Sequence, residues 1–319
     1  MLNFWQNLSK PFTVLAPMDG VTDYVFREII SDLAKPDVLF TEFISAKGLF
    51  SARNERLLYE LQYSNNQKPI VAQIWGTQPE LFSKAATLIE NLGFDGIDIN
   101  MGCPVKTVVK LGSGSALIKN KGLVIELIDA IKAGSKHSSV SVKTRIGFTE
   151  IETESWLGFL LEQKLDALTV HARIAKDMSS TAAAWGELKK VVTLRNEISP
   201  NTLIIGNGDV KNYQEVIDKH TNYLVDGVMI GRGVFSDPWV FDNNTLKQPH
   251  TSDDYLKLLL KHTKLFVDTY GTKRNFEDMK KFFKIYVRNF RGAKKLMNNL
   301  MRCRNYDEVE KEVNLLLHY

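Results

Sequence analysis

Eight short apolar runs, rich in β-branched residues, recur at roughly even intervals through residue 231. Segments with helical spacing and a polar face separate most of them, an alternation typical of parallel strands joined by helices. The predicted strands are residues 13–17, 38–42, 70–74, 96–100, 141–145, 167–171, 203–207 and 228–231. Eight such units favour an α/β fold closed into a (β/α)8 barrel, the TIM barrel. An open doubly wound sheet is the alternative, but its first turn needs a G-x-G-x-x-G loop, which Ala16–Gly20 is not.

The strand pattern stops at about residue 243, and the remaining sequence is typical of helices. The predicted helices span residues 254–270, 276–291, 293–303 and 306–318. Gly271 and Gly292 lie at two junctions, where glycine commonly ends a helix. The linker 242–252 is polar and contains Pro249, so we place the domain boundary there. We therefore expect a barrel domain, residues 1–243, followed by a small all-α helical-bundle domain, residues 244–319.

The composition, with 44% hydrophobic and 24% charged residues, excludes disordered, collagen-like and fibrous coiled-coil chains. No run approaches the roughly 18 apolar residues of a membrane span, and the opening segment MLNFWQNLSK is too polar for a signal peptide. The two cysteines, Cys103 and Cys303, are too few for a disulfide framework and are not spaced for a metal site. We expect a cytoplasmic protein without a metal site. Cys303, on a basic helix, is interpreted as a small buried hydrophobe.

Positive charge is concentrated near the C-terminus. The net charge is +4, and residues 257–304 contain 14 basic and three acidic residues. Part of this charge forms a stripe at helical spacings of three and four: Lys280, Lys281, Lys284, Arg288, Arg291, Lys294 and Lys295. A solvated helix face is the ordinary explanation of such a stripe. Because few acidic residues lie between these cations, a polyanion such as nucleic acid explains it better. We expect the interleaved Phe282, Phe283 and Phe290 to lie in the core.

Most predicted strands end in polar or glycine-rich residues, and in a (β/α)8 barrel these ends converge on the active site. Gly206–Asp209 and Gly231–Gly233 follow strands seven and eight, where barrels commonly bind phosphate through backbone N–H groups. Glycine lets the main chain approach a ligand, and Arg232 adds a cation that can form paired hydrogen bonds. Either motif alone is also consistent with a tight turn. Together, at adjacent strand ends, they favour phosphate binding.

Gln73 and Lys143 end strands three and five, within reach of a flavin ring bound at the strand ends. A lysine near the ring N1 stabilises the anionic reduced flavin. A salt bridge from Lys143 to Glu42 or Asp98 is an equally good interpretation. The residues alone therefore indicate a phosphate-bearing cofactor and leave its identity open.

Cys103 lies in the segment Asn100–Pro104, on a loop after strand four. A thiol over the pocket can act as a nucleophile or as a proton donor, although a free cysteine is more often a small buried hydrophobe. The flanking glycine and proline, and the glycine-rich segment Leu111–Ser115 beyond them, favour a functional loop. His171 and Arg173 end strand six, in the same ring of strand ends.

Eight motifs, taken together, resemble one known family, the tRNA-dihydrouridine synthases, flavin enzymes that reduce a uridine of tRNA. The motifs are LAPMDGVTD (15–23), VAQIWG (71–76), GIDINMGCPVKTVVKLGSGSALIKN (96–120), SVKTRIGF (141–148), TVHAR (169–173), IGNGDV (205–210), VMIGRGVFSDPWVF (228–241) and GAKKLMNNLMRCRNYDEVE (292–310). They cover essentially the whole chain, and the third is the most specific. The resemblance implies a flavin-binding TIM barrel followed by a small helical tRNA-binding domain.

The resemblance also implies cofactors and residue roles: FMN is bound, and NADPH, or NADH, is the transient hydride donor. The implied FMN contacts are Pro17, Met18, Asp19, Gln73, Lys143, His171, Asn207, Gly208, Asp209, Gly231 and Arg232. Flavin N5 delivers hydride to uracil C6 while Cys103, the catalytic acid, protonates C5 from the other face. The uridine is turned out of the tRNA into the pocket, where Asn100 and Arg173 hydrogen-bond its polar edge. The implied contacts to the tRNA backbone are Lys280, Lys281, Lys294 and Lys295.

Two other functions compete with this one. A barrel flavoenzyme that reduces a free pyrimidine, related in chemistry to dihydroorotate dehydrogenases, has no need of the basic C-terminal segment. A non-catalytic tRNA-binding protein with this fold has no need of Cys103, Lys143 or Arg232, and all three are present. We therefore expect a monomeric, cytoplasmic tRNA-dihydrouridine synthase.

Overall fold

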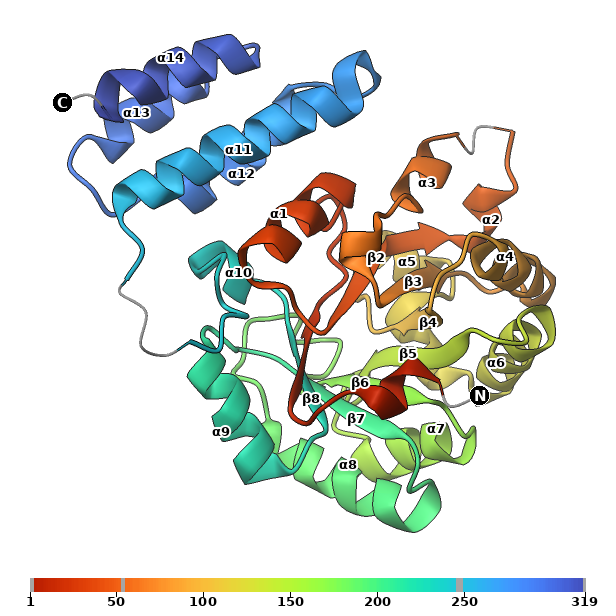
Figure 1. Cartoon of the computed structure of the whole chain (residues 1–319). Helices are drawn as coiled ribbons and strands as arrows, with labels where there is room; N and C mark the ends of the chain where they lie inside the picture. Colours follow the sequence, from red (N-terminus) through yellow and green to blue (C-terminus); the bar gives the residue numbers. More distant parts are fainter. Residues whose placement is uncertain (1–2, 53–54, 245–248, 318–319) are drawn as a thin grey trace.

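Eight parallel strands form a closed barrel in the computed structural model, which describes residues 3–52, 55–244 and 249–317 (Figure 1). In chain order they are β1 Phe12–Leu15, β2 Val38–Ser45, β3 Ile70–Trp75, β4 Gly96–Met101, β5 Ser139–Arg145, β6 Ala167–His171, β7 Leu203–Asn207 and β8 Gly227–Ile230. The barrel closes where β1 pairs with β8, with Phe12 opposite Gly227. Each strand overlaps a predicted run, so the prediction of an α/β barrel is confirmed.

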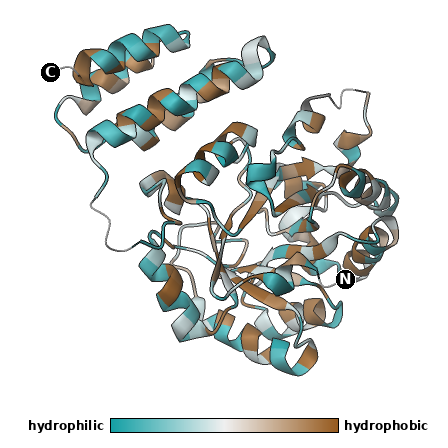
Figure 2. Ribbon diagram, viewed as in Figure 1, coloured by the Kyte–Doolittle hydropathy of each residue, from teal (hydrophilic) through white to brown (hydrophobic). Residues whose placement is uncertain are grey.

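Helices lie between the strands on the outside of the barrel (Figure 1). The longer ones are α1 Tyr24–Ala34, α4 Pro79–Asn91, α6 Lys121–Gly134, α8 Trp185–Ile198 and α9 Tyr213–Tyr223. The shorter ones are α2 Ala46–Leu49, α3 Glu55–Glu60, α5 Lys106–Lys110, α7 Gly158–Glu162 and α10 Gly233–Ser236. Asp23, Asn120 and Asn212 cap α1, α6 and α9, since each side chain accepts a hydrogen bond from a backbone N–H of the first turn. Apolar and polar residues alternate along these helices (Figure 2), and the buried apolar ones pack against the strands.

Apolar side chains fill the amino-terminal end of the barrel interior, which is a packed core and not a pore. Trp5 lies on the short 3-10 turn Phe4–Asn7 before β1, with its ring centroid 5.9 Å from that of Phe12. Its indole N–H donates to Ser139 Oγ at 3.1 Å. Gly227 leaves room for the Phe12 ring, because a Cβ at this position would lie 2.3 Å from a ring carbon. Polar side chains are thereby concentrated at the other end of the barrel.

Four further helices follow the barrel: α11 Ser252–Tyr270, α12 Glu277–Tyr286, α13 Ala293–Leu300 and α14 Tyr306–Leu317. The predicted helices 276–291 and 293–303 end earlier than expected. After α12 the chain adopts left-handed conformations at Asn289 (φ +61°) and Gly292 (φ +95°), which no α-helix accommodates. Residues 245–248 of the predicted linker, and residue 318 of the last predicted helix, lie outside the described residues.

The helices after residue 251 pack against one another and against the barrel. Helix α11 contacts α12, α14 and also α1 (Figure 1). Phe26 of α1 stacks on Phe282 of α12, with ring centroids 5.5 Å apart, and Asp23 pairs with Arg274 at 2.7 Å. Phe282 and Phe283 are buried and Phe290 is half-buried against the same core, so their prediction as core residues is confirmed. Within the described residues, every helix is too short or too polar to span a bilayer.

Candidate active site

A cavity of about 360 Å³ lies at the carboxyl ends of the strands, between the tails of β1, β5, β6, β7 and β8. Ten predicted site residues line it: Pro17, Met18, Lys143, His171, Arg173, Asn207, Gly208, Asp209, Gly231 and Arg232. Asp19, Gln73, Asn100 and Cys103 are not part of this lining. The volume is within the usual range of small-molecule sites, roughly 300–1,000 Å³.

A chain of buried hydrogen bonds crosses the barrel interior from β5 to β3, next to the cavity. Ser141 Oγ and Gln73 Nε2 each donate to Asp98, to Oδ1 and Oδ2 respectively, at 2.7 Å. Asn100 Nδ2 donates to Gln73 Oε1 at 2.9 Å. Because an ionised carboxylate only accepts, Asp98 sets the orientation of the Gln73 amide, which in turn sets that of Asn100. Burial raises the pKa of Asp98 to about 7, against the opposing effects of its hydrogen bonds and of Lys143.

The loop that carries Cys103 is held by Asn100 and Arg145. Asn100 Oδ1 accepts hydrogen bonds from the backbone N–H groups of Cys103 at 2.9 Å and Gly102 at 3.1 Å, and Arg145 Nε donates to Gly102 O at 2.7 Å. Gly114 packs beneath the loop with φ +60°, and a Cβ there would lie 2.7 Å from Cys103 O. Burial raises the pKa of the Cys103 thiol. The thiol is therefore protonated at neutral pH.

Lys143 is directed into the cavity. Its Nζ donates to Asn207 Oδ1 at 3.3 Å, and Asn207 Nδ2 donates to a backbone carbonyl of β8 at 2.8 Å. Among the described residues it forms no ion pair with Glu42 or Asp98, so the salt-bridge interpretation is wrong. Burial, together with the charge of Arg145, lowers the pKa of Lys143 to about 8.

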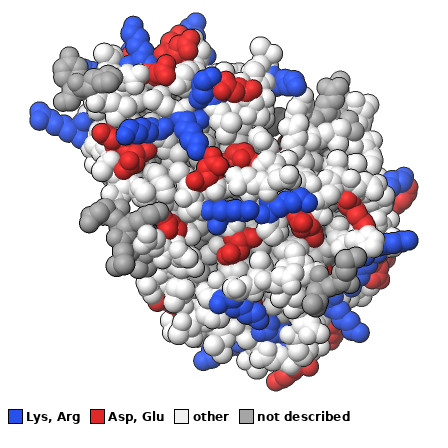
Figure 3. Space-filling view, viewed as in Figure 1, with Lys and Arg blue, Asp and Glu red and all other residues white. Residues whose placement is uncertain are grey.

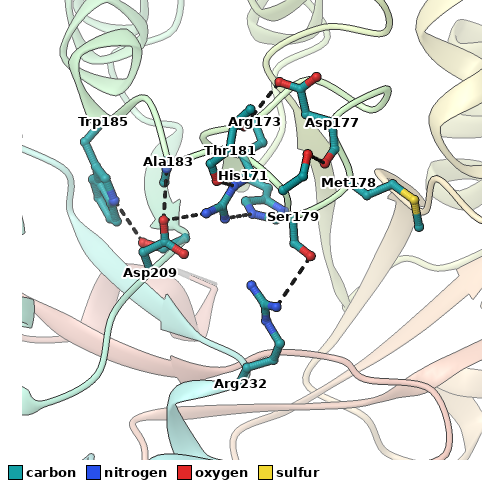
Figure 4. Close-up of polar contacts among 12 residues, drawn as sticks. His171, Arg173, Asp177, Met178, Ser179, Thr181, Ala183, Trp185, Asp209 and Arg232 are labelled. Carbon is teal, nitrogen blue, oxygen red and sulfur yellow. Dashed lines mark hydrogen bonds and ion pairs between the residues drawn. The ribbon is translucent and has the colours of Figure 1, made fainter.

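Arg173 is the centre of a polar cluster at the ends of β6 and β7 (Figure 4). Its Nη1 lies 3.0 Å from His171 Nε2, its Nη2 forms an ion pair with Asp209, and its Nε donates to Thr181 O at 2.7 Å. His171 Nε2 must accept from this guanidinium, so the imidazole is neutral. Burial and the surrounding cations lower its pKa accordingly. Asp209 Oδ2 also accepts the Ala183 N–H at 2.9 Å, which ties the loop after β6 to the turn after β7.

The glycine-containing turns after β7 and β8 are neighbours, because the two strands are paired. Gly208 (φ +134°) and Asp209 (φ +52°) adopt left-handed conformations that turn the chain sharply. Gly231 lines the same cavity, and the exposed Arg232 places its Nη1 3.4 Å from Ser179 Oγ (Figure 4). Both turns and the guanidinium thus border one cavity. Phosphate binding there stays a prediction.

Arg145 was not among the predicted site residues, and Asp98 was considered only as a salt-bridge partner of Lys143. Arg145 is buried, and besides holding the thiol loop its Nη1 donates to Ile174 O at 3.2 Å and Met178 O at 2.9 Å. Burial and the charge of Arg173 lower its pKa to about 10. Both residues could have been singled out from the sequence, because each is a charged residue in a run predicted to be a buried strand. A buried charge needs polar partners, so such a residue is expected to hold neighbouring groups in place.

The lysines predicted to contact tRNA do not share one environment. Lys280 is only 8% exposed and donates to Glu277 Oε1 at 2.6 Å and to a backbone carbonyl at the end of α13 at 2.8 Å. Its predicted place on the surface is therefore corrected: its side chain joins α12 to α13. Lys281, Lys294 and Lys295 are exposed, and in the part of the chain that the structure describes they form no ion pair.

Acidic residues neutralise more of the basic segment than the sequence suggested. Lys261 pairs with Asp32 of α1 at 2.8 Å, and Figure 3 shows acidic side chains among the basic ones over α11 and α14. Lys281 is differently placed, because a Cβ on Gly20 would lie 3.6 Å from its Nζ. This ammonium is therefore beside the loop after β1, the loop that lines the cavity through Pro17 and Met18.

Known proteins resemble this chain along nearly its whole length. The family model described as "Dihydrouridine synthase (Dus)" matches residues 14–318. A probable tRNA-dihydrouridine synthase of Staphylococcus aureus (strain COL) is 43% identical over 317 residues, which cover 96% of this chain and 93% of the relative. A probable tRNA-dihydrouridine synthase 2 of Bacillus subtilis (strain 168) is 42% identical over 313 residues, 96% of this chain and 94% of the relative.

Solved structures resemble the barrel at low sequence identity. A 2-naphthoyl-CoA reductase bound to 2-naphthoyl-CoA has a TM-score of 0.56 at 11% identity, over 75% of this chain and 52% of that one. A 6-hydroxypseudooxynicotine amine oxidase from Pseudomonas geniculata N1 has a TM-score of 0.50 at 11% identity, over 72% and 46%. At such identity these likenesses concern the fold alone.

Proposed function

The chain belongs to the dihydrouridine synthase family, and on that premise we propose that it is a tRNA-dihydrouridine synthase, a flavin-dependent oxidoreductase that reduces the C5–C6 double bond of a uridine in tRNA. The names of the relatives supply the substrate. The structural observation that carries the proposal is the Cys103 thiol, which burial keeps protonated and whose loop Asn100 and Arg145 hold in place. A reduction that adds hydride and proton across a double bond needs such an acid next to its cofactor.

FMN is the cofactor that we propose for the cavity, because the donor set fits a phosphorylated, electron-accepting ring. Arg232 and the turns containing Gly208 and Gly231 suit the phosphate, since a guanidinium and accessible backbone N–H groups both bind it well. Lys143 and Asn207 suit the ring, where an ammonium stabilises negative charge. When bound, FMN supplies the hydride for the uracil. The full proposed set is Pro17, Met18, Asp19, Gln73, Lys143, His171, Asn207, Gly208, Asp209, Gly231 and Arg232.

Cys103 is the acid that donates a proton to uracil C5 in this proposal. Its raised pKa keeps the proton available at neutral pH. Asn100 and Arg145 hold its loop in place through hydrogen bonds to the Cys103 N–H and to the Gly102 carbonyl. After the proton leaves, the positive charges of Arg145 and Lys143 stabilise the thiolate.

Asn100 and Arg173 retain N–H groups for the carbonyl edge of uracil. Asn100 Nδ2 uses one of its two N–H groups on Gln73. Arg173 uses one N–H of each terminal nitrogen, on His171 and on Asp209, and keeps the other. Their existing contacts fix both side chains, so these donors are held in place before the uridine is turned out of the tRNA into the site.

The helices after the barrel bind the tRNA in this proposal, with residues 244–319 as the tRNA-binding domain and residues 1–243 as the catalytic one. The exposed Lys281, Lys294 and Lys295 contact backbone phosphates. The protein acts as a cytoplasmic monomer. NADPH is the hydride source that we propose, with NADH as the alternative.

A visible spectrum of the purified protein, followed by anaerobic reduction with NADPH and mixing with unmodified tRNA or free uridine, tests the proposal. We expect a flavin spectrum, reoxidation by tRNA and dihydrouridine in the product. Reoxidation by a free pyrimidine alone would favour the small-molecule flavoenzyme. A colourless protein that takes up no added FMN would leave tRNA binding without catalysis.

A further inference from the structure

A smaller cavity, of about 160 Å³, lies at the rim of the barrel beside the loop that carries Cys103. Its lining comes from the junction of β2 with α2, from the chain between the end of β3 and the start of α4, and from the segment after α5. We call it the side cavity. None of the residues that we assign to FMN, to the acid or to uracil lines it. Figure 1 shows α2 and α4 on the opposite side of the molecule from α13 and α14.

The segment 111–115 separates the side cavity from the Cys103 loop. Ser113 of this segment lines the cavity, while the Ser115 N–H donates to Cys103 O at 3.0 Å. The segment packs directly on the loop, because a Cβ on Gly114 would lie 2.7 Å from the same carbonyl oxygen. The side cavity is thus one chain segment away from the acid. A nucleotide joined to a uridine at Cys103 is within its reach.

Trp75 gives the side cavity an aromatic face. It lies on the same face of β3 as Gln73, which forms its hydrogen bonds inside the barrel, but two residues nearer the mouth. The ring is half-buried and lines the cavity, and among the described residues no aromatic ring or cation is stacked on it. The indole N–H groups of Trp5, Trp156 and Trp185 each donate a hydrogen bond within the protein, whereas that of Trp75 donates none to the described residues. The ring and its N–H group are therefore available to a ligand.

The polar lining of the side cavity suits an anion with hydrogen-bonding groups. Lys47 is exposed and is the only charged residue among the described residues of the lining. It forms no ion pair with any residue that the structure describes. Ser113 is 2% exposed, and its hydroxyl has no hydrogen-bond partner in the same part of the chain. A buried hydroxyl without a partner costs free energy, so a ligand that bonds to Ser113 recovers it.

Positive charge lies next to the side cavity as well. Residues 99–125, which include the Cys103 loop, contain four lysines and no acidic residue. Two of them, Lys106 and Lys110 on α5, are exposed and form no ion pair within the described residues. Leu111, next to Lys110, lines the cavity and is 63% exposed. This side of the rim presents cations beside an apolar and aromatic surface, the combination that binds single-stranded nucleic acid.

We propose that the side cavity binds the base of a nucleotide directly adjacent to the target uridine. Turning the uridine out of the tRNA removes a stacking partner from its neighbour, and an aromatic side chain replaces that partner. The base stacks on Trp75 and accepts a hydrogen bond from Ser113, while Lys47 and Lys110 bind phosphates of the strand. A volume of about 160 Å³, below the roughly 300–1,000 Å³ of cofactor sites, suits one base.

The inference rests on the proposed function, because it makes the side cavity part of tRNA recognition. Helices α13 and α14 and the side cavity lie on opposite sides of the molecule, so the tRNA is held on both sides of the target uridine. A strand held at two points fixes the uridine between them in front of the acid.

Equilibrium binding of tRNA, measured without NADPH, tests the side cavity. The position of the target uridine is first mapped from the dihydrouridine that the wild type forms in an unmodified transcript. Two further transcripts carry an abasic ribose at the nucleotide before or after that position. The protein variants are Trp75→Leu, with Trp75→Phe as its conservative control, Ser113→Ala, and Lys47→Gln, with Lys189→Gln, at an exposed position of α8, as its control.

We expect one of the two abasic transcripts to bind the wild type about tenfold more weakly than the intact transcript, the effect of losing one stacked base. Trp75→Leu should weaken binding of the intact transcript about as much, and its ratio between intact and abasic transcripts should approach one. Trp75→Phe keeps an aromatic face and should keep most of the wild-type ratio. Ser113→Ala should weaken binding of the intact transcript about fivefold. Lys47→Gln should weaken binding of all transcripts and lower the slope of log K against log salt concentration by about one, and its control should change neither quantity.

The inference is refuted if neither abasic transcript differs from the intact one on the wild type, or if Trp75→Leu keeps the wild-type ratio. A Trp75→Leu protein that binds tRNA normally but is reduced slowly by NADPH would assign the cavity to the hydride donor and overturn the inference as well. A wild type that forms dihydrouridine but is indifferent to both abasic positions overturns the side cavity alone. One that forms no dihydrouridine overturns the proposed function and the inference together.

Discussion

The direction of the hydrogen-bond chain through Gln73 can be reversed by exchanging an acid and an amide. In Asn100→Asp, the new carboxylate still accepts the two loop N–H groups, but its other oxygen faces Gln73 Oε1. Turning the Gln73 amide by 180° would bring its oxygen against Asp98 instead. While Asp98 is ionised, the single variant therefore contains one oxygen–oxygen contact in place of a hydrogen bond.

The magnitude follows from complete burial. Gln73 and Asp98 are 0% exposed, so no water replaces the lost partner, and an unsatisfied buried polar group costs about 1–3 kcal/mol. The second carboxylate repels ionised Asp98 and raises its pKa above the wild-type value of about 7. We expect Asn100→Asp to lower the free energy of unfolding at pH 9 by about 3 kcal/mol. The loss should shrink as the pH falls, because protonated Asp98 becomes a donor.

The double variant Asp98→Asn/Asn100→Asp should recover about 2 kcal/mol of that loss, because the turned Gln73 amide then accepts from Asn at position 98 and donates to Asp at position 100. Urea denaturation at pH 9 measures the stability, and single-turnover reduction of tRNA reports whether the Cys103 loop returns to its place. If the double variant is no more stable than Asn100→Asp alone, the chain does not set the orientation of these amides.

Three further predictions concern the acid, the basic surface and the core of the C-terminal helices. Cys103→Ala should keep FMN and tRNA bound but slow single-turnover uridine reduction about 100-fold or more, and an unchanged rate would remove its role as the acid. Lys281→Gln and Lys294→Gln should each weaken tRNA binding and reduce by about one the slope of log K against log salt concentration. The control Lys189→Gln, at an exposed position of α8, should change neither quantity. Slopes equal to that of the wild type would exclude Lys281 and Lys294 from the interface. His262 is fully buried, and burial lowers its pKa to about 3, whereas its pKa in the unfolded chain is 6.5. The stability that neutral His262 contributes is therefore complete above pH 6.5. It is lost as the pH falls toward 3, by about 1.4 kcal/mol per pH unit. His262→Leu should flatten this acid loss in urea titrations between pH 7 and 4, and a slope unchanged from wild type would contradict it.

The barrel could be predicted because its strands are buried on both faces, and such strands appear in the sequence as continuous apolar runs. The buried polar residues also left a signal in the alternation of β4, where Ile97 and Ile99 flank Asp98 and Asn100. That alternation places the two polar side chains on one face of the strand. It does not give their partners, because these depend on register: Asp98 stands opposite Gln73 on one side and Ser141 on the other.

Lys280 shows where helical spacing stops being informative. Spacing fixes the direction of a side chain around its own helix but not which neighbour that side of the helix meets. Lys280 and Lys281 are adjacent in sequence, yet one is buried toward α13 and the other reaches the loop after β1. Only the packing of α12, which is set by contacts such as Phe282 on Phe26, separates them.

The pairing of Phe12 with Gly227 has a consequence for how the protein is made. On the ribosome, β1 appears early and keeps an unpaired edge until β8 has been synthesised, an exposure that favours association with other chains. Arg274, the partner of Asp23, emerges later still. A nascent chain therefore has neither a closed barrel nor the Asp23–Arg274 ion pair until the C-terminal helices have been synthesised, and a product released before that point would be prone to aggregation.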